Sequence, residues 1–161
     1  MNPDGEHDAG FDTIEDLPSL AARAARLWPE RTCLTFDATG ERLSFAAIEA
    51  RSNTIANALV TQGIRPGDKV GVMLRNVASF PLSWLAISKA GATMVPLNVF
   101  YRRDDAAHLL AHSEARAVIT ADEFVPLLAE IAETGGPAPR RLSTDGDGDG
   151  KATELAPLLL L

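Results

Sequence analysis

The first residues that suggest chemistry are the acidic repeat at residues 145–150 and the lysine that follows it. The run DGDGDG places carboxylates at alternate positions, as in the calcium-binding loop of an EF-hand. The twelfth position of that loop needs a bidentate Glu, but here it holds Ala156, and no amphipathic helix leads into the run. The adjoining GDGK has the wrong glycine spacing for a phosphate-binding loop, and Ala152 follows Lys151 where Ser or Thr is needed. We therefore interpret the stretch as a flexible acidic linker without metal or phosphate.

Two histidines, one lysine and one cysteine are the other candidates. His108 and His112 are four residues apart and would share a helix face, as metal-binding pairs do, but no third ligand is evident, which favours two surface histidines. Lys89 falls in the last turn of an expected helix, where the helix dipole alone explains a lysine. Cys33 lies in the apolar run TCLTF, so we expect a small buried residue and not a nucleophile. The residues alone thus predict a scaffold with no catalytic, cofactor-binding or metal-binding residue.

The composition is typical of one soluble globular domain. The chain has 161 residues, of which 46% are hydrophobic and 23% charged. Residues 1–16 contain six acidic residues and no Lys or Arg, against a net charge of −7 for the whole chain, so we expect a disordered acidic tail over 1–13. No basic cluster is present that could follow a phosphate backbone, so we expect no nucleic-acid partner. We also expect no secretory signal and no membrane span, since no apolar run approaches ~20 residues, and therefore a cytoplasmic location.

Regularly alternating elements predict the architecture. A helix over LPSLAARAARLWP, which ends near Pro29, is followed by a hairpin around residues 37–40, and Ser44 then caps a helix that stops at Gly63. Strands at KVGVML, TMVPL and AVIT alternate with helices over 78–89, 104–113 and about 124–133. This order is typical of parallel βαβ units, so we predict an α/β fold with helices on both faces of a parallel sheet and a short N-terminal hairpin. The apolar faces predict the core: Leu17, Leu20, Ala24 and Leu27; Phe45, Ile48, Ile55 and Leu59; Phe124, Leu127, Leu128 and Ile131.

The stretch KAGATMVP leaves almost no room for a loop between a helix and a strand. Gly91 ends the helix, the small residues around it allow the helix to pack closely on the sheet, and Pro96 is expected at the end or the edge of its strand. After Thr134 the hydrophobic pattern fails, so residues 134–154 are predicted to be a Gly/Pro/Asp-rich linker or loop. Residues 155–161, LAPLLLL, are interpreted as a truncated apolar element.

Taken in order, these motifs resemble the N-terminal part of the adenylate-forming (AMP-binding) ligases, which include acyl-CoA synthetases, luciferases and peptide-synthetase adenylation domains. The hairpin strand of Leu-Ser/Thr-Tyr/Phe type is residues 43–45, the G-D-x-V strand is residues 67–70, and Asn76 follows in a turn. The K-A-G-G/A-x-x-x-P motif is residues 89–96. The resemblance covers residues 30–120 closely and 17–133 more loosely, and PLNVFYRRDDAAHLLAHSEARAVIT is most similar to the acyl-CoA synthetase branch. Residues 14–133 are therefore expected to form part of the large N-terminal domain.

The resemblance also implies a chemistry, in which a carboxylic or fatty acid and ATP give an acyl-adenylate and pyrophosphate, and the thiol of coenzyme A then displaces AMP. In the family, a T-S-G-T-T-G-x-P-K loop cradles the phosphates, a Thr-Glu pair holds Mg²⁺, an Asp binds the ribose and a C-terminal Lys assists adenylation. None of these motifs has a match in the 161 residues, so no site residue is carried over and we expect no cofactor bound by this chain alone.

The leading hypothesis from the sequence is the N-terminal piece of an acyl-CoA synthetase, truncated by a premature stop, a frameshift or an incomplete gene model, and inactive and poorly behaved alone. Two alternatives stay open. One is a self-standing α/β binding or regulatory module that kept the fold and lost the chemistry. The other is a split enzyme, in which the remainder of the ligase is a separate chain that supplies the phosphate loop and the C-terminal domain.

Overall fold

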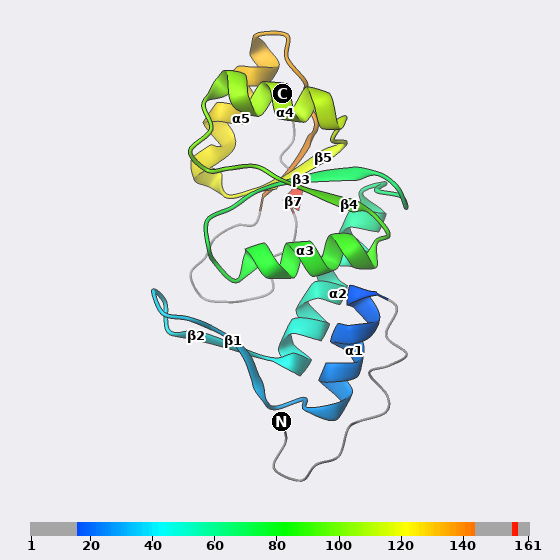
Figure 1. Cartoon of the computed structure of the whole chain (residues 1–161). Coiled ribbons are helices and arrows are strands. Elements are labelled where there is room, and N and C mark those ends of the chain that lie inside the picture. Colours follow the sequence, from blue (N-terminus) through cyan, green and yellow to red (C-terminus); the bar gives the residue numbers. More distant parts are fainter. Residues whose placement is uncertain (1–15, 144–155, 158–161) are drawn as a thin grey trace.

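The computed structural model describes residues 16–143 and 156–157, and Figure 1 shows how they are arranged. The elements follow the alternation predicted from the sequence, with end points that differ by a residue or two. In chain order they are α1 (Leu17–Leu27), β1 (Thr32–Phe36), β2 (Glu41–Ser44), α2 (Phe45–Thr61), β3 (Lys69–Met73), α3 (Ser79–Lys89), β4 (Thr93–Pro96), α4 (Arg103–Ser113), β5 (Ala117–Thr120), the 3₁₀ turn η2 (Asp122–Phe124), α5 (Val125–Glu133), β6 (Arg140–Ser143) and β7 (Ala156–Pro157).

The described strands form two sheets. The larger sheet has the order β4-β3-β5-β6-β7, in which β3 to β6 are mutually parallel and β7 pairs antiparallel with β6. Helices α4 and α5 cover one face of this sheet, while α3 and the second half of α2 pack on the other, with α1 farther from the sheet (Figure 1). The smaller sheet is the antiparallel hairpin β1-β2. The predicted fold, a parallel α/β sheet between helices with a short N-terminal hairpin, is confirmed.

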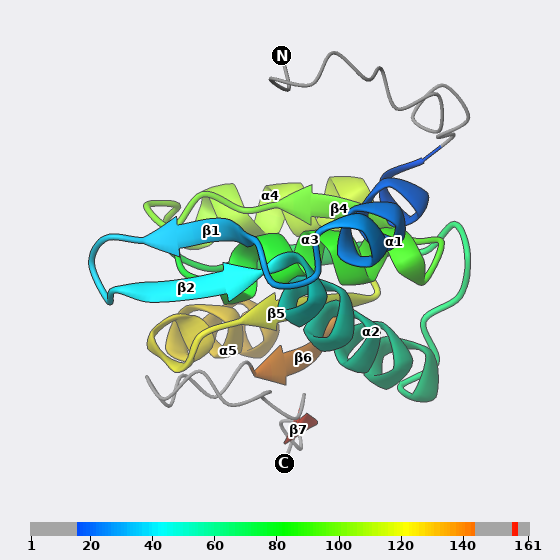
Figure 2. The same ribbon diagram turned by 90° about the horizontal axis from the view of Figure 1, so that it is seen from below.

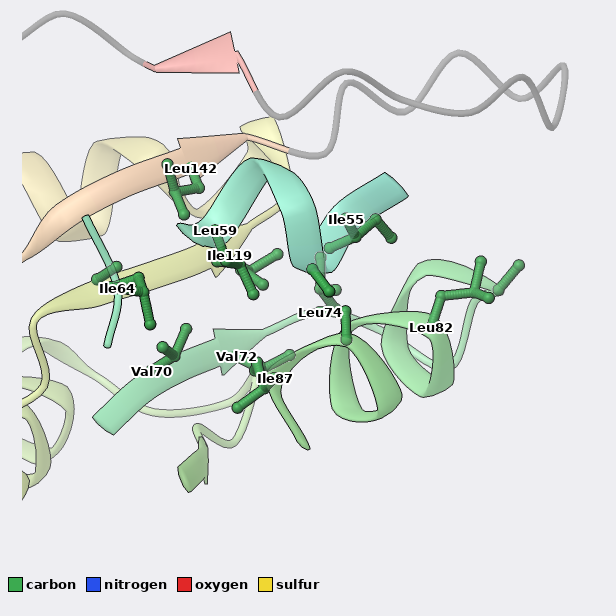
Figure 3. Close-up of a cluster of buried hydrophobic side chains, with 14 of the residues drawn as sticks. Ile55, Leu59, Ile64, Val70, Val72, Leu74, Leu82, Ile87, Ile119 and Leu142 are labelled. Atoms are coloured by element: carbon green, nitrogen blue, oxygen red, sulfur yellow. The ribbon is translucent and has the colours of Figure 1, made fainter. Parts of the chain in front are cut away.

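Each face of the sheet carries its own core, because successive side chains of a strand point to opposite faces. Val70, Val72 and Ile119 point toward the α2–α3 side, where they meet Leu59 and Ile87 (Figure 3). On the α4–α5 side, the core contains Met73, Leu97, Ala106, Leu110, Val118, Phe124, Leu128 and Ile131. Burying one such aliphatic or aromatic side chain fully contributes about 1.5–3 kcal/mol.

Capping interactions and a glycine explain where α1 and α2 begin and where α2 ends. At α1, Asp16 accepts a hydrogen bond from the Ser19 amide at 2.8 Å, which satisfies one of the free N–H groups of the first turn. At α2, the predicted cap is confirmed, since Ser44 Oγ accepts from the Ala47 amide at 3.2 Å. Gly63, with φ of +87°, then ends α2 in a left-handed conformation that glycine adopts without strain.

The short return between α3 and β4 is built as the sequence predicted. Gly91 has φ of +70°, and its carbonyl oxygen accepts a hydrogen bond from the Gly67 amide at 2.8 Å. A Cβ on Gly91 would lie 3.1 Å from Cβ of Pro66, so a larger residue would crowd the neighbouring turn. Pro96 ends β4, which is an edge strand, where the missing N–H costs no ladder bond.

Two expectations are wrong. Residues 140–143, inside the predicted 134–154 linker, form β6, and Leu142 is fully buried against β5 and the core around α2. One leucine between arginines and a serine carries no hydrophobic period, so only its place beside β5 makes this segment a strand. Cys33 is exposed and not buried, because β1 belongs to a two-stranded hairpin in which only one face packs on the core.

Some predictions fall outside the described residues. The acidic tail over 1–13 does, as do residues 144–154 of the linker and all of 155–161 except the two residues of β7.

The apolar face predicted for α1 is buried only in part. Ala24 is buried, but Leu20 and Leu27 are 39% and 41% exposed.

Candidate functional site

The most elaborate polar site in the described residues surrounds the ammonium group of Lys89 at the end of α3. Lys89 Nζ lies 2.6 Å from Asn53 Oδ1, 2.9 Å from Ser52 Oγ and 3.3 Å from the Glu49 carbonyl oxygen. It also forms an ion pair with Glu49 Oε2 at 2.8 Å. The lysine side chain is only 10% exposed and that of Glu49 22%. We name these four residues the Lys89 cluster.

Helix periodicity on α2 brings the acceptors together. Glu49, Ser52 and Asn53 are related by three and four residues, so their side chains share one face of α2, and α3 delivers Lys89 to that face. Glu49 Oε1 accepts a further hydrogen bond from Asn53 Nδ2 at 3.2 Å. Glu49 Oε2 is buried and forms no hydrogen bond of good geometry within the described residues, so the ion pair with Lys89 compensates its burial.

The structure therefore corrects the explanation of Lys89 from the helix dipole alone. The ammonium links the last turn of α3 to the first half of α2, across 36–40 residues of sequence. A lysine held by a carboxylate and three oxygen acceptors serves as a structural cation. It is not presented as a free amine for Schiff-base chemistry. In the sequence, Lys89 stood out only because it begins the K-A-G-G/A-x-x-x-P motif. Nothing in the sequence of α2 indicated that Glu49, Ser52 and Asn53 would contact it.

An open hollow of about 620 Å³ lies over the Lys89 cluster, between the start of α1 and helices α2 and α3. Asp16 and Ser19 line it from α1, and a hydrogen bond from each of the Ser19 side chain and amide lowers the pKa of Asp16. The hollow offers amide, hydroxyl and carboxylate groups, but its one lysine is already paired. Nothing in this lining forms a nucleophile with an adjacent base.

The carboxyl ends of β3 and β5 form the second place where ligands could bind, since open parallel sheets bind ligands where neighbouring loops diverge to opposite faces. Here Arg75 and Glu123 bridge the two loops with hydrogen bonds of 2.7, 2.8 and 3.1 Å, and the guanidinium lies 5.6 Å from the centre of the Phe124 ring. This bridge lowers the pKa of Glu123 and raises that of Arg75. We name these two residues the Arg75–Glu123 clasp. The clasp joins the two loops but provides no nucleophile with an adjacent base.

The remaining candidates are dispersed. His108 and His112 are exposed on α4 with their rings 6.0 Å apart, as predicted for surface histidines. Across residues 16–143, no three His, Cys, Asp or Glu side chains converge as a metal site. Neighbouring side chains partly shield the Cys33 thiol from water, although the residue as a whole is exposed, and this raises the pKa of Cys33 and makes its thiol less reactive. The DGDGDG repeat and GDGK lie outside the described residues.

Comparison with known proteins shows the family to which this chain belongs. The model of the AMP-binding enzyme family matches residues 21–157. Long-chain fatty acid transport protein 1 of Rattus norvegicus is 35% identical over 130 residues, which cover 81% of this chain and 20% of that protein. The crotonobetaine/carnitine–CoA ligase of Citrobacter koseri is 32% identical over 120 residues, covering 73% of this chain and 23% of the ligase. The chain belongs to the AMP-binding enzyme family.

A solved structure agrees on the fold. The N-terminal domain of FACL13 from Mycobacterium tuberculosis superposes with a TM-score of 0.78 at 21% identity, over 92% of this chain and 39% of that domain. At this identity the match shows the fold alone. The chain spans about a fifth of the length of the curated relatives and covers only the N-terminal portion of the AMP-binding domain. Within the described residues, none of the helices has the length and apolar character needed to cross a membrane.

Proposed function

We propose that this chain is the N-terminal scaffold of an acyl-CoA synthetase. Such an enzyme activates a carboxylic or fatty acid with ATP and Mg²⁺ as an acyl-adenylate, and then forms the coenzyme A thioester. The observation that carries the proposal is the family match over residues 21–157, a range that includes the β3–α3–β4 unit with its tight return at Gly91. The names of the two relatives, a fatty acid transport protein and a CoA ligase, support a carboxylate substrate.

We further infer that the chain is inactive alone. The 161 residues contain no phosphate-loop sequence of T-S-G-T-T-G-x-P-K type. The Lys89 cluster and the Arg75–Glu123 clasp hold helices and loops together and offer no group that could transfer an adenylyl unit. The remainder of the ligase, as a separate chain or as a continuation of this one, would supply ATP, Mg²⁺ and coenzyme A binding. A cytoplasmic location belongs to the same proposal.

Two measurements test this function. The first is sequencing of the encoding DNA beyond codon 161 in three frames, where a T-S-G-T-T-G-like loop within a few tens of codons is expected. The second is calorimetric titration of the purified chain with Mg·ATP, where no saturable binding is expected. A downstream reading frame that begins with the loop identifies a split ligase. If no such loop is encoded, or if the chain binds Mg·ATP by itself, the scaffold proposal fails and a self-standing binding module takes its place.

A further inference from the structure

The amino ends of β3, β5 and β6 carry a group of charged side chains in which bases outnumber acids. Figure 2 shows the start of α1 and the end of α2 on the right, the side from which β6 runs to the left. We name the charged residues at this end of the sheet the amino-edge cluster; they are Arg65, Asp68, Lys69, Glu114, Arg116 and Arg140. Four bases and two acids give this cluster a positive net charge.

Asp68 lies at the centre of the amino-edge cluster. Its carboxylate accepts a hydrogen bond from the Arg65 amide at 2.8 Å and lies 3.3 Å from Arg116 Nη1. The hydrogen bond from the Arg65 amide, followed by the contact with Arg116 and the charge of Arg65, lowers the pKa of Asp68. Lys69 lies 3.6 Å from Glu114, whose side chain is 81% exposed. The two acids of the cluster are therefore both engaged by Lys69 and Arg116.

Two arginines of the cluster make no hydrogen bond to a carboxylate in the part of the chain that the structure describes. Arg65 is exposed, and its guanidinium donates no hydrogen bond there. Arg140 Nη1 donates to the carbonyl oxygen and to Oε1 of Gln62, at 2.7 and 2.8 Å. Because a guanidinium binds a carboxylate more strongly than it binds a neutral oxygen, both arginines can still gain from an acidic partner.

The same chain contains a segment of opposite charge. Residues 1–15 include five acidic residues and no Lys or Arg, whereas residues 16–143 include 14 basic and 13 acidic ones. The carboxyl edge of the sheet differs from the amino edge, because acids outnumber bases in the segments that follow β3, β4 and β5: Arg75, Arg102, Arg103, Asp104, Asp105, Asp122 and Glu123. The charges of the molecule therefore attract residues 1–15 to the amino edge and not to the carboxyl edge.

Residues 1–15 join the described chain close to this cluster. Asp16 and Asn57 of α2 line the same hollow, and Gln62, the partner of Arg140, follows Asn57 by five residues, which is about 7.5 Å along a helix. Fifteen extended residues span up to about 50 Å, so this segment is long enough to reach every member of the cluster. A covalent link of this length also keeps the effective concentration of its carboxylates in the millimolar range.

We propose that residues 1–15 dock through their carboxylates on the amino-edge cluster of the same chain, with Arg65 and Arg140 as the main contacts. A single exposed ion pair contributes only about 0–1 kcal/mol, so docking depends on several contacts together and weakens as salt is added. The docked segment shields the positive edge of the sheet from other acidic partners. This surface does not depend on the ligase chemistry proposed above.

Paramagnetic relaxation in the full-length chain tests the docking. A nitroxide is attached to Ala9→Cys, with Cys33→Ser leaving a single thiol, and the broadening of backbone amide signals is measured. The measurement is made in about 20 mM and about 500 mM salt, where the Debye length is about 20 Å and about 4 Å. At low salt we expect the amides of residues 65–69, 116 and 140 to broaden at least about twice as much as that of Arg102, and at high salt we expect this difference to disappear.

Matched variants of the same labelled chain identify the charges responsible. Arg65→Gln removes one charge from the cluster and should reduce the broadening at Arg116 and Arg140 roughly twofold or more, because one of the two main contacts is lost. Arg102→Gln is the control, since Arg102 is equally exposed but follows β4 at the opposite edge of the sheet, and it should change nothing. Replacing the five acids of residues 1–15 by Asn and Gln should abolish the difference between the cluster and Arg102. Unchanged amide shifts in β3 and β5 check that each variant is folded.

Four results overturn the assignment. The first is broadening at the cluster no greater than at Arg102. The second is broadening that persists at high salt or in the chain whose segment has lost its five acids. The third is broadening that Arg102→Gln reduces and Arg65→Gln does not. The fourth is broadening that appears in an unlabelled chain mixed with a labelled one, because the segment would then contact a second copy.

Discussion

Replacing Lys89 by Met tests whether the Lys89 cluster holds α2 and α3 together. The change keeps the length and apolar stem of the side chain but removes the ammonium, so Glu49, Ser52 and Asn53 lose their shared donor. Removing one partner of a buried ion pair costs about 3–5 kcal/mol, and each unsatisfied polar group about 1–3 kcal/mol. Since Glu49 is 22% exposed and keeps some contact with water, we expect a loss of about 2–3 kcal/mol in the free energy of unfolding.

Urea unfolding followed by the fluorescence of Trp28 and Trp84 measures this loss. With a slope of about 1–3 kcal/mol per molar urea, the midpoint should fall by roughly 0.7–3 M while the slope stays unchanged. Lys69→Met is the matched control. Lys69 lies 3.6 Å from Glu114, but their side chains are 42% and 81% exposed, so its loss should cost less than about 0.5 kcal/mol.

The double variant Lys89→Met with Glu49→Met separates the contribution of the Lys89–Glu49 ion pair from that of side-chain packing. Replacing both charges by apolar groups of similar volume should recover most of the stability, because no uncompensated carboxylate is left buried. The reasoning is refuted if Lys89→Met lies within about 0.5 kcal/mol of wild type, or if the double variant is as unstable as the single one.

Three further changes test the packing, the corrected elements and the electrostatics. Gly71→Ala should cost about 1–3 kcal/mol in urea unfolding, because its Cβ would lie 3.0 Å from side-chain atoms of Leu97 and Val118; no change would show that this site is loose. Leu142→Ala should cost about 2–5 kcal/mol, since β6 buries this side chain fully, whereas a linker residue would cost almost nothing. Glu123→Gln should flatten the fall of the thermal midpoint between pH 5 and pH 3. The pKa of Glu123 is lowered in the folded chain, so its contribution is present above the ordinary value of 4.5 and is lost as the pH falls through the lowered value; identical profiles would contradict this.

Local pattern was sufficient to predict most of the fold. The helix caps at Ser44 and Gly63 and the return at Gly91 depend on neighbouring residues, and all three are as predicted. β6 could not be predicted, because its strand character comes from pairing with β5 about 23 residues earlier in the sequence and not from its own composition. The exposure of Cys33 was missed for a related reason. An apolar run indicates a strand, but not how many sheets cover it.

The candidate sites were also predictable only where they depend on neighbouring residues in the sequence. The motif around Lys89 was recognisable, but its acceptors on α2 lie 36–40 residues away and form no pattern with it in the sequence. The Arg75–Glu123 clasp spans 48 residues and was likewise not foreseen. The Lys89 cluster appears only when α2 and α3 pack together, and the clasp appears only when the parallel strands β3 and β5 bring the loops that follow them to one edge of the sheet. Such contacts are properties of the topology, which the sequence indicates in outline but not in side-chain detail.

The most direct test of the central claim is carboxylate-dependent exchange between ATP and pyrophosphate, measured on the 161-residue chain before and after the remainder of a ligase is added. A scaffold without the phosphate loop should show only background exchange alone and should gain exchange that requires a carboxylic acid when the remainder is present. Exchange by the pure chain, in proportion to its concentration and dependent on the acid, would contradict the account, because the chemistry would then reside in residues that we interpret as scaffold.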